Sequence, residues 1–247
     1  MRWHPRLDHY EVLEMYAAAV ERRGYGDLIW GFIDGTFQGF CRPQKLNQEA
    51  WYSGYYGGHG LKYQVIVTPD GLLSSLTQHF PGPWNDWRML EESGILPRLR
   101  LIMEGHRTLY LYGDPAYHSQ WGILAPFHHP SGHRYLADDE QAFNRLLSRA
   151  RIAVENGLGC VQNYYSRTSY EQGIQPSWNE PATIYLCSGL FTNFLTCFRG
   201  NLVSSRFACY PPDIWEYLCV DPPGGEAEAG AAGRAAGAAG GAIGGQE

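Results

Sequence analysis

The chain has 247 residues, of which 44% are hydrophobic and 14% aromatic, a composition typical of a folded globular protein. Its formal charge of −6 argues against a strong, nonspecific attraction to nucleic-acid phosphates. No apolar run approaches the roughly 18 residues of a membrane span, so we expect no membrane association.

Composition predicts three segments: an N-terminal helical segment over residues 1–25, one domain over residues 26–223, and a tail over residues 224–247. The tail is mostly glycine and alanine and is expected to be disordered. The central segment is long enough to bury a substantial core. The six cysteines form no C-x-x-C pair, so we predict reduced thiols in the core of a cytosolic or nuclear protein.

The first elements predict a helix followed by an antiparallel meander. Apolar residues at three- and four-residue intervals predict an amphipathic helix from Tyr10 to Val20, ended by Gly24. The apolar run of residues 27–35 predicts a strand that ends on Asp34. Residues 48–60 are glycine-rich and predict a flexible loop.

A hairpin and an interrupted helix are predicted next. Residues 61–71 are rich in β-branched side chains and close with a Thr-Pro-Asp-Gly turn, and residues 72–83 supply a partner strand that prolines end. Residues 86–104 predict helical structure that Gly94 and Pro97 interrupt.

The second half of the domain predicts two strands and two long helices. Residues 107–117 give an apolar strand that ends on Asp114, and residues 123–127 give a short strand. Residues 137–159 predict a long amphipathic helix that carries Glu155 and stops at its glycines. Residues 183–198 predict a packing helix, although a strand remains possible.

Three acids occupy suggestive positions: Asp34 and Asp114 end predicted strands, and Glu155 lies on the long helix. If the two strands are neighbours, their carboxylates emerge together, and a helix across the sheet can add the third. Clustered carboxylates repel one another unless divalent cations neutralise them. Oxygen ligands favour Mg²⁺ or Mn²⁺, and two such ions about 4 Å apart suit phosphodiester chemistry.

Five segments in this order resemble the DDE-type transposases of the PIF/Harbinger group, from about Gly26 to Tyr165. They read GFIDGTFQGFCRP, YSGYYGGHGLKYQVIVTPDGLL, PGPWNDWRML, YLYGDPAYHSQWGILAPF and FNRLLSRARIAVENGLG. The resemblance implies an α/β, ribonuclease-H-like fold in which helices flank a mixed central sheet. It also implies a DNA endonuclease and strand transferase that uses two Mg²⁺ or Mn²⁺ ions.

The resemblance assigns catalytic and metal-binding roles to Asp34, Asp114 and Glu155. Asp86 becomes an accessory acidic candidate, because Asn85-Asp86 stand where the family usually has His-Asp. It further implies a separate Myb/SANT-like DNA-binding protein as partner and a nuclear location. Few residues precede Asp34, so we expect DNA recognition to depend on such a partner.

Several basic residues are candidate DNA contacts, with purely structural roles equally open. They are His59, Lys62, Arg149 and Arg151. The loop histidines His128, His129 and His133 are read as polar surface residues rather than metal ligands.

One departure supports a second hypothesis. Asn156 stands where the family has an arginine that could contact phosphate. The alternative is therefore a catalytically inactive, domesticated or decaying transposase that binds DNA or protein without turnover.

Overall fold

The computed structural model describes residues 3–44, 47–128, 135–169, 173–175 and 180–222. The predicted tail and the predicted loop residues His129 and His133 lie outside these ranges. The chain divides into two compact units, Met1–Pro211 and Pro212–Glu247. In the second unit, Asp213 caps the short helix α7 (Ile214–Leu218) by accepting hydrogen bonds from the backbone N–H groups of Trp215 and Glu216.

The first unit is built around one sheet, to which the described residues contribute seven strands. The strands are β1 (Ile29–Phe40), β2 (Tyr52–Ser53), β3 (Gly58–Val67), β4 (Leu73–Leu76), β5 (Phe80–Pro81), β6 (Tyr110–Tyr112) and β7 (Ile123–Leu124). The order is β2-β3-β1-β6-β7, and β4 and β5 also pair with β3. Pairs involving β3 are antiparallel, whereas β1 with β6 and β6 with β7 are parallel. The predicted mixed central sheet is confirmed.

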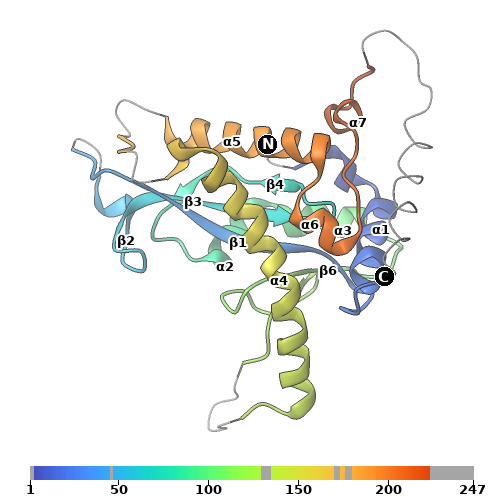
Figure 1. Cartoon of the computed structure of the whole chain (residues 1–247). Coiled ribbons are helices and arrows are strands. Elements are labelled where there is room, and N and C mark those ends of the chain that lie inside the picture. Colours follow the sequence, from blue (N-terminus) through green and yellow to red (C-terminus); the bar gives the residue numbers. More distant parts are fainter. Residues whose placement is uncertain (1–2, 45–46, 129–134, 170–172, 176–179, 223–247) are drawn as a thin grey trace, which may run out of the picture. The chain divides into compact units, whose positions relative to one another are not determined.

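Helices pack on this sheet, as the ribonuclease-H-like prediction required (Figure 1). The α-helices are α1 (Tyr10–Glu21), α2 (Asp86–Ser93), α3 (Ile95–Ile102), α4 (Asp138–Tyr164), α5 (Pro181–Arg199) and α6 (Leu202–Phe207). Three short 3₁₀ segments accompany them: η1 (Pro5–Asp8), η2 (Glu49–Trp51) and η3 (Ser166–Thr168). Within the described ranges, no helix combines the length and apolar character that crossing a bilayer requires.

The two faces of the sheet receive different helices. On β3, Tyr63 stacks on Tyr185 of α5 and Val67 lies against Gly157 of α4, so this face belongs to α4 and α5. The alternate residue Lys62 points to the other face, where it contacts Asp86 of α2. Because side chains alternate along a strand, this assignment fixes the direction of each residue on the paired strand β1 as well.

The strand that carries Asp34 is longer than predicted. β1 runs on to Phe40, which pairs with His59 of β3, so Asp34 does not end the strand. Its parallel pairing with β6, however, stops at Phe32 opposite Tyr112. Asp34 is therefore the point at which β1 loses its neighbour on one side while keeping β3 on the other. The sequence signal marked the end of one pairing rather than the end of the strand.

The predicted flexible loop of residues 48–60 is instead η2 followed by the β2–β3 hairpin, whose turn spans residues 54–57. Glycine density gave the wrong prediction because these glycines serve the hairpin itself: Gly57 takes a positive φ of 65° in its turn, and Gly60 serves close packing. A Cβ on Gly60 would collide with the ring of Phe37.

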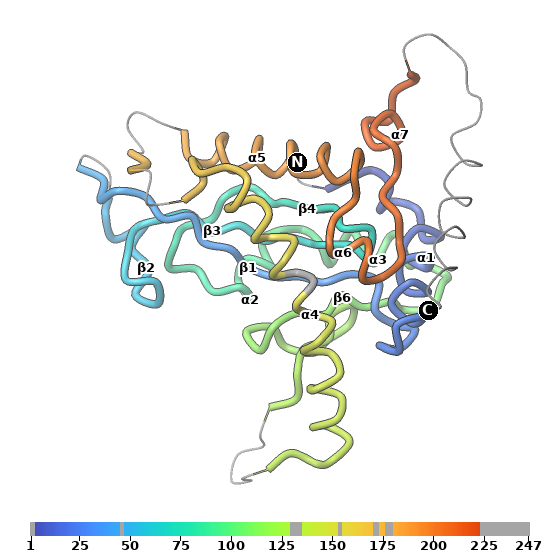
Figure 2. The backbone as a smooth tube through the Cα atoms, in the orientation of Figure 1, coloured from blue at the N-terminus to red at the C-terminus, as the bar shows by residue number. Residues whose placement is uncertain are grey.

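The long helix α4 also continues through its predicted stop, past Gly157 and Gly159 to Tyr164. Gly157 lies where the helix meets the sheet, since a Cβ there would be 3.1 Å from Cγ1 of Val67. Figure 2 shows that α4 passes over β1. Here glycine permits close approach of helix and sheet and does not end the helix.

Gly157→Ala and Gly159→Ala are expected to have opposite effects on the free energy of unfolding. At Gly159 an added Cβ meets only Asn163 Nδ2, at 3.8 Å, so alanine should stabilise the helix by about 0.5–1 kcal/mol. At Gly157 the crowding against the buried Val67 should offset that gain or make the change destabilising. Urea denaturation of both variants checks this, and equal stabilisation by the two would contradict it.

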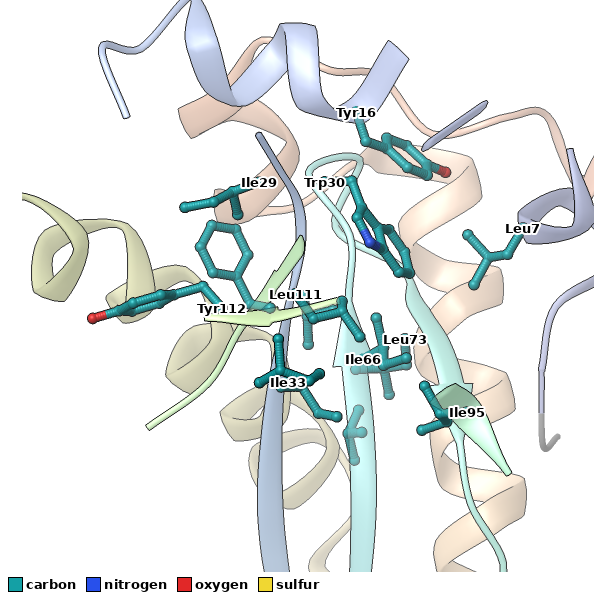
Figure 3. Close-up of a cluster of buried hydrophobic side chains, with 14 of the residues drawn as sticks. Leu7, Tyr16, Ile29, Trp30, Ile33, Ile66, Leu73, Ile95, Leu111 and Tyr112 are labelled. Carbon is teal, nitrogen blue, oxygen red and sulfur yellow. The ribbon is translucent and has the colours of Figure 1, made fainter. Parts of the chain in front are cut away.

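The hydrophobic core includes side chains of α1 and of the strands, and Trp30 of β1 is fully buried in it (Figure 3). Ile33, Ile66 and Leu111 from three neighbouring strands belong to the same cluster of buried side chains. The predicted helices at residues 10–20, 86–104 and 183–198 are confirmed. All six cysteines are free, as predicted, but only Cys197 and Cys209 are buried and Cys187 and Cys219 are exposed.

Candidate active site

Asp34 and Asp114 both lie just beyond the paired part of the parallel strands β1 and β6, where they line one cavity. The register ends with Phe32 opposite Tyr112, so each aspartate follows the last paired residue of its segment by two positions. Asp34 is still within β1 and leaves the sheet on the same face as Phe32. The negative charge of Asp114 raises the pKa of Asp34, so the two carboxylates are close enough to repel each other.

Asp34 is held in a confined environment. Its side chain is 13% exposed, and its Oδ1 accepts a hydrogen bond of 2.9 Å from the backbone N–H of Gly35. The pKa of Asp34 is raised to about 6, chiefly by burial, which the positive charge of Arg151 opposes and the negative charges of Asp114 and Asp86 reinforce. A cation brought to this position would therefore be strongly stabilising.

Asp114 follows β6 in a tight turn. Its Oδ1 accepts a hydrogen bond from the backbone N–H of Ala116 at 2.9 Å, which orients the carboxyl group. Burial raises the pKa of Asp114, the Ala116 hydrogen bond lowers it, and the charge of Asp86 raises it. Gly113 is required before it, because a Cβ there would be 2.6 Å from the ring of Tyr117.

Arg151 lies between Glu155, on the same helix α4, and Asp34. Nη2 of Arg151 lies 3.6 Å from Oδ2 of Asp34 and 3.7 Å from Oε1 of Glu155. The two carboxylate oxygens can therefore be no farther apart than the sum of those distances. Both contacts are longer than a hydrogen bond, and Glu155 is 61% exposed, so the arrangement is loose. Nε of Arg151 is buried and has no hydrogen-bond partner among the described residues.

Asp86 approaches Asp34 from the other face of β1. Gly35, the residue after Asp34, points to that face, and a Cβ on it would collide with the Asp86 carboxylate. The Asp86 carboxylate thus occupies the space that a side chain larger than glycine would need at position 35. Its Oδ1 accepts a hydrogen bond of 2.7 Å from Nζ of Lys62, which also donates to the carbonyl oxygen of Trp84 at 3.0 Å.

Of the charged groups described above, all except Glu155 line one cavity of about 430 Å³ at the edge where β6 ends. The acids and bases that line it are Asp34, Asp86, Asp114, Lys62 and Arg151. The sequence matches the DDE superfamily endonucleases over residues 33–191. This chain belongs to that family.

A curated relative is consistent with this membership. A probable transposase for insertion sequence element IS702 from Microchaete diplosiphon is 28% identical over 128 residues, which cover 50% of this chain and 43% of that protein. The chain thus spans less than half the length of that relative. The comparison with solved structures found no match.

The carboxylates of this DDE superfamily member suit a hard divalent cation in chemistry and charge. Within the described ranges, no three His, Cys, Asp or Glu side chains converge closely enough to hold one ion as they lie. Four carboxylates, of Asp34, Asp86, Asp114 and Glu155, face two cations, Lys62 and Arg151, which leaves two negative charges uncompensated. Two ions about 4 Å apart with ligand distances of about 2.1 Å can span carboxylate oxygens up to roughly 8 Å apart. The separation of Asp34 and Glu155 falls within this limit.

Gly35→Ala is expected to lower the free energy of unfolding by about 1–3 kcal/mol by displacing the Asp86 carboxylate from Lys62. The matched control is Gly54→Ala, since a Cβ on Gly54 meets nothing within 4 Å. Urea denaturation compares the two variants. Adding Asp86→Ala should cost less in the Gly35→Ala protein than in the wild type, because the ion pair is already broken. Equal stability of the two glycine variants would contradict the close packing.

The predicted DNA contacts lie in different places. Lys62 is only 9% exposed and lines the cavity with its ammonium paired to Asp86, whereas Arg149 is exposed on α4. His59 is half-buried and lines a second hollow. Arg151 lies among the acids, a position that its spacing of four residues from Glu155 could have indicated. Sequence reasoning missed Gly35, whose role depends on packing with α2.

Proposed function

We propose that this DDE superfamily member is a divalent-metal-dependent DNA endonuclease and strand transferase of the PIF/Harbinger type. The observation that carries the proposal is that Asp34 and Asp114 line one cavity beyond the end of the β1–β6 pairing, with Arg151 between Asp34 and Glu155. These are the three acids that the sequence pattern selected. Family membership supports the nuclease class, and the substrate and activity are part of the proposal.

Each residue has a role in this reaction. Asp34 and Asp114 would hold the divalent ions, and Glu155 would complete the set by exchanging Arg151 for an ion. When bound, two such ions activate an attacking water or 3′-hydroxyl and stabilise the leaving oxygen. Arg151, with its unpartnered Nε, would then contact a phosphate oxygen of the DNA. Lys62 would hold the Asp86 carboxylate fixed at the cavity wall.

A second candidate function is an inactive transposase-derived module that binds DNA or protein. The observation that favours it is that Arg151 already partners Asp34 and Glu155, and Lys62 already partners Asp86. Internal cations thus reduce the repulsion that would otherwise require metal. The two uncompensated charges, and the fact that Asp114 forms no ion pair with any described residue, favour the active enzyme.

A separate Myb/SANT-like DNA-binding protein and a nuclear location belong to the same proposal. They rest on the PIF/Harbinger resemblance of the sequence. Co-expression with a DNA-binding partner of that class would be expected to increase cleavage of specific sites over random plasmid sequence.

The proposal is tested by nicking of supercoiled plasmid with Mn²⁺, Mg²⁺ or EDTA. We expect nicking with either metal, none with EDTA, and products whose 3′-hydroxyl ends accept nucleotides from a terminal transferase. The Asp114→Ala protein, purified in parallel, serves as the contamination control. Equal traces of nicking in both proteins would favour the inactive module.

A further inference from the structure

A ridge formed by Tyr55 and Tyr56, in the turn between β2 and β3, separates two hollows. Both tyrosines line the cavity that holds Asp34 and Asp114. Tyr56 also lines a second hollow of about 640 Å³, so it is shared by the two. A strand of nucleic acid with its reacting phosphate in the first cavity can therefore continue across this ridge into the second hollow.

The ridge presents an aromatic ring to solvent on a fixed base. Tyr55 is 91% exposed, which is unusual for a large aromatic side chain. Its neighbour Tyr56 is stacked on Phe37, with ring centroids 4.2 Å apart and an interplanar angle of 6°. Tyr55 meets Tyr56 edge-on, with centroids 4.9 Å apart and an angle of 83°. One face of an anchored aromatic pair is thus left available for stacking.

The second hollow differs from the first in charge. Its lining includes Arg42 and His59 together with the aromatic residues Phe37, Phe40 and Tyr52, and no Asp or Glu is found among the described residues that line it. Aromatic rings with interspersed basic groups are the combination that binds single-stranded nucleic acid, through base stacking and phosphate contacts. The carboxylates of the first cavity repel an anionic group such as a phosphate unless metal is present. The second hollow does not repel it in this way.

We propose that Tyr55 is a stacking platform for an unpaired nucleobase of the DNA substrate, and that the second hollow receives the continuing single strand with Arg42 at its phosphates. This inference deepens and rests on the proposed function, because it places unpaired nucleotides next to the phosphate that reacts. The endonuclease would accordingly prefer DNA with a frayed or single-stranded segment at the cleavage point. With intact duplex DNA, the free-energy cost of unpairing the bases would reduce binding.

Binding of two fluorescent DNA probes by the full chain tests the platform, with Ca²⁺ in place of Mg²⁺. One probe is a blunt duplex, and the other has the same sequence with a single-stranded overhang that carries 2-aminopurine. Tyr55→Ala should weaken binding of the overhang probe roughly 5- to 150-fold and leave the blunt duplex unchanged. Quenching of 2-aminopurine on binding should be lost as well. Tyr55→Phe should keep both properties, since stacking does not need the hydroxyl.

The second hollow has its own variant, Arg42→Gln, and the ridge has a control. Arg42→Gln should lower the salt slope of overhang binding by about 0.7, the contribution of one phosphate contact on a single strand. Tyr210→Ala removes another exposed tyrosine, 74% exposed and outside both hollows, and should change nothing. Tyr55→Ala should melt at the wild-type temperature, because its ring is in solvent.

Wild-type affinity for the overhang probe in Tyr55→Ala, or an equal loss on both probes, would overturn the platform. If no nicking is observed but Tyr55→Ala loses overhang binding selectively, the platform stands and only catalysis fails. Absence of binding to either probe by the wild type would overturn both proposals together.

Discussion

Asp114→Asn is expected to reduce the rate of metal-dependent plasmid nicking at least roughly 100-fold, the loss typical of removing a group that stabilises transition-state charge. The substitution keeps the shape of the side chain and its hydrogen bond from the Ala116 N–H, because the amide oxygen can still accept it. It removes one of the two aspartate charges that line the cavity beyond the β1–β6 pairing. Initial rates of supercoil loss with Mn²⁺ measure the effect.

Asp34→Asn should give a loss of similar size, and the double variant should be little worse than either single variant. Groups that act as one unit are strongly non-additive in their kinetic effects. The control is Glu91→Gln, which removes an exposed carboxylate from α2 that does not line the cavity. Additive losses in the double variant would show that the two aspartates do not share a site. Nicking by Asp114→Asn at the wild-type rate would remove Asp114 from the reaction.

Asp34→Asn is also expected to stabilise the metal-free protein at neutral pH, by about 2–3 kcal/mol. Burial raises the pKa of Asp34 from 3.8 to about 6, so the folded state binds a proton more tightly than the unfolded state does. Wild-type stability should therefore fall as the pH rises from about 4 to about 6, and the full penalty should persist above that window. The charged groups Arg151, Asp114 and Asp86 all contribute to this shift. Urea denaturation with EDTA across this pH range should show a flatter profile for the variant.

Divalent metal should make the wild type more stable than the Asp34→Asn protein. Mg²⁺ or Mn²⁺ at about 100 times its dissociation constant should stabilise the wild type by about 2.7 kcal/mol, and Asp34→Asn should blunt this gain. Thermal melts with and without metal measure it, and Glu92→Gln on the exposed side of α2 is the matched control. A wild-type melting temperature that does not respond to either metal would count against a metal site at these carboxylates.

Periodicity and turn chemistry were sufficient to predict most elements of this protein. The amphipathic stripe of α1, the Thr-Pro-Asp-Gly turn after β3 and the glycine between α2 and α3 are local signals, and each stands where it was predicted. The two aspartates that follow apolar runs were also local signals. They mark the positions where the parallel pairing of β1 and β6 ends.

Glycines play different structural roles in this fold, and the sequence alone does not distinguish them. Gly94 ends α2 in the left-handed conformation, with a φ of 74°, as a helix stop should. Gly157 continues α4, because the helix needs a small residue where it crosses Val67. Gly35 leaves room for Asp86. Only contacts between distant segments distinguish these cases.

By itself, then, the sequence determined most of the secondary-structure elements, their order along the chain and the three acids that the family pattern selects. The tertiary structure alone decided which charges meet: Arg151 between Asp34 and Glu155, and Lys62 against Asp86 across Gly35. The physical reason is that an element's apolar periodicity depends on neighbours a few residues away. An ion pair across a sheet depends instead on register, on the alternation of side chains and on the packing of helices far along the chain.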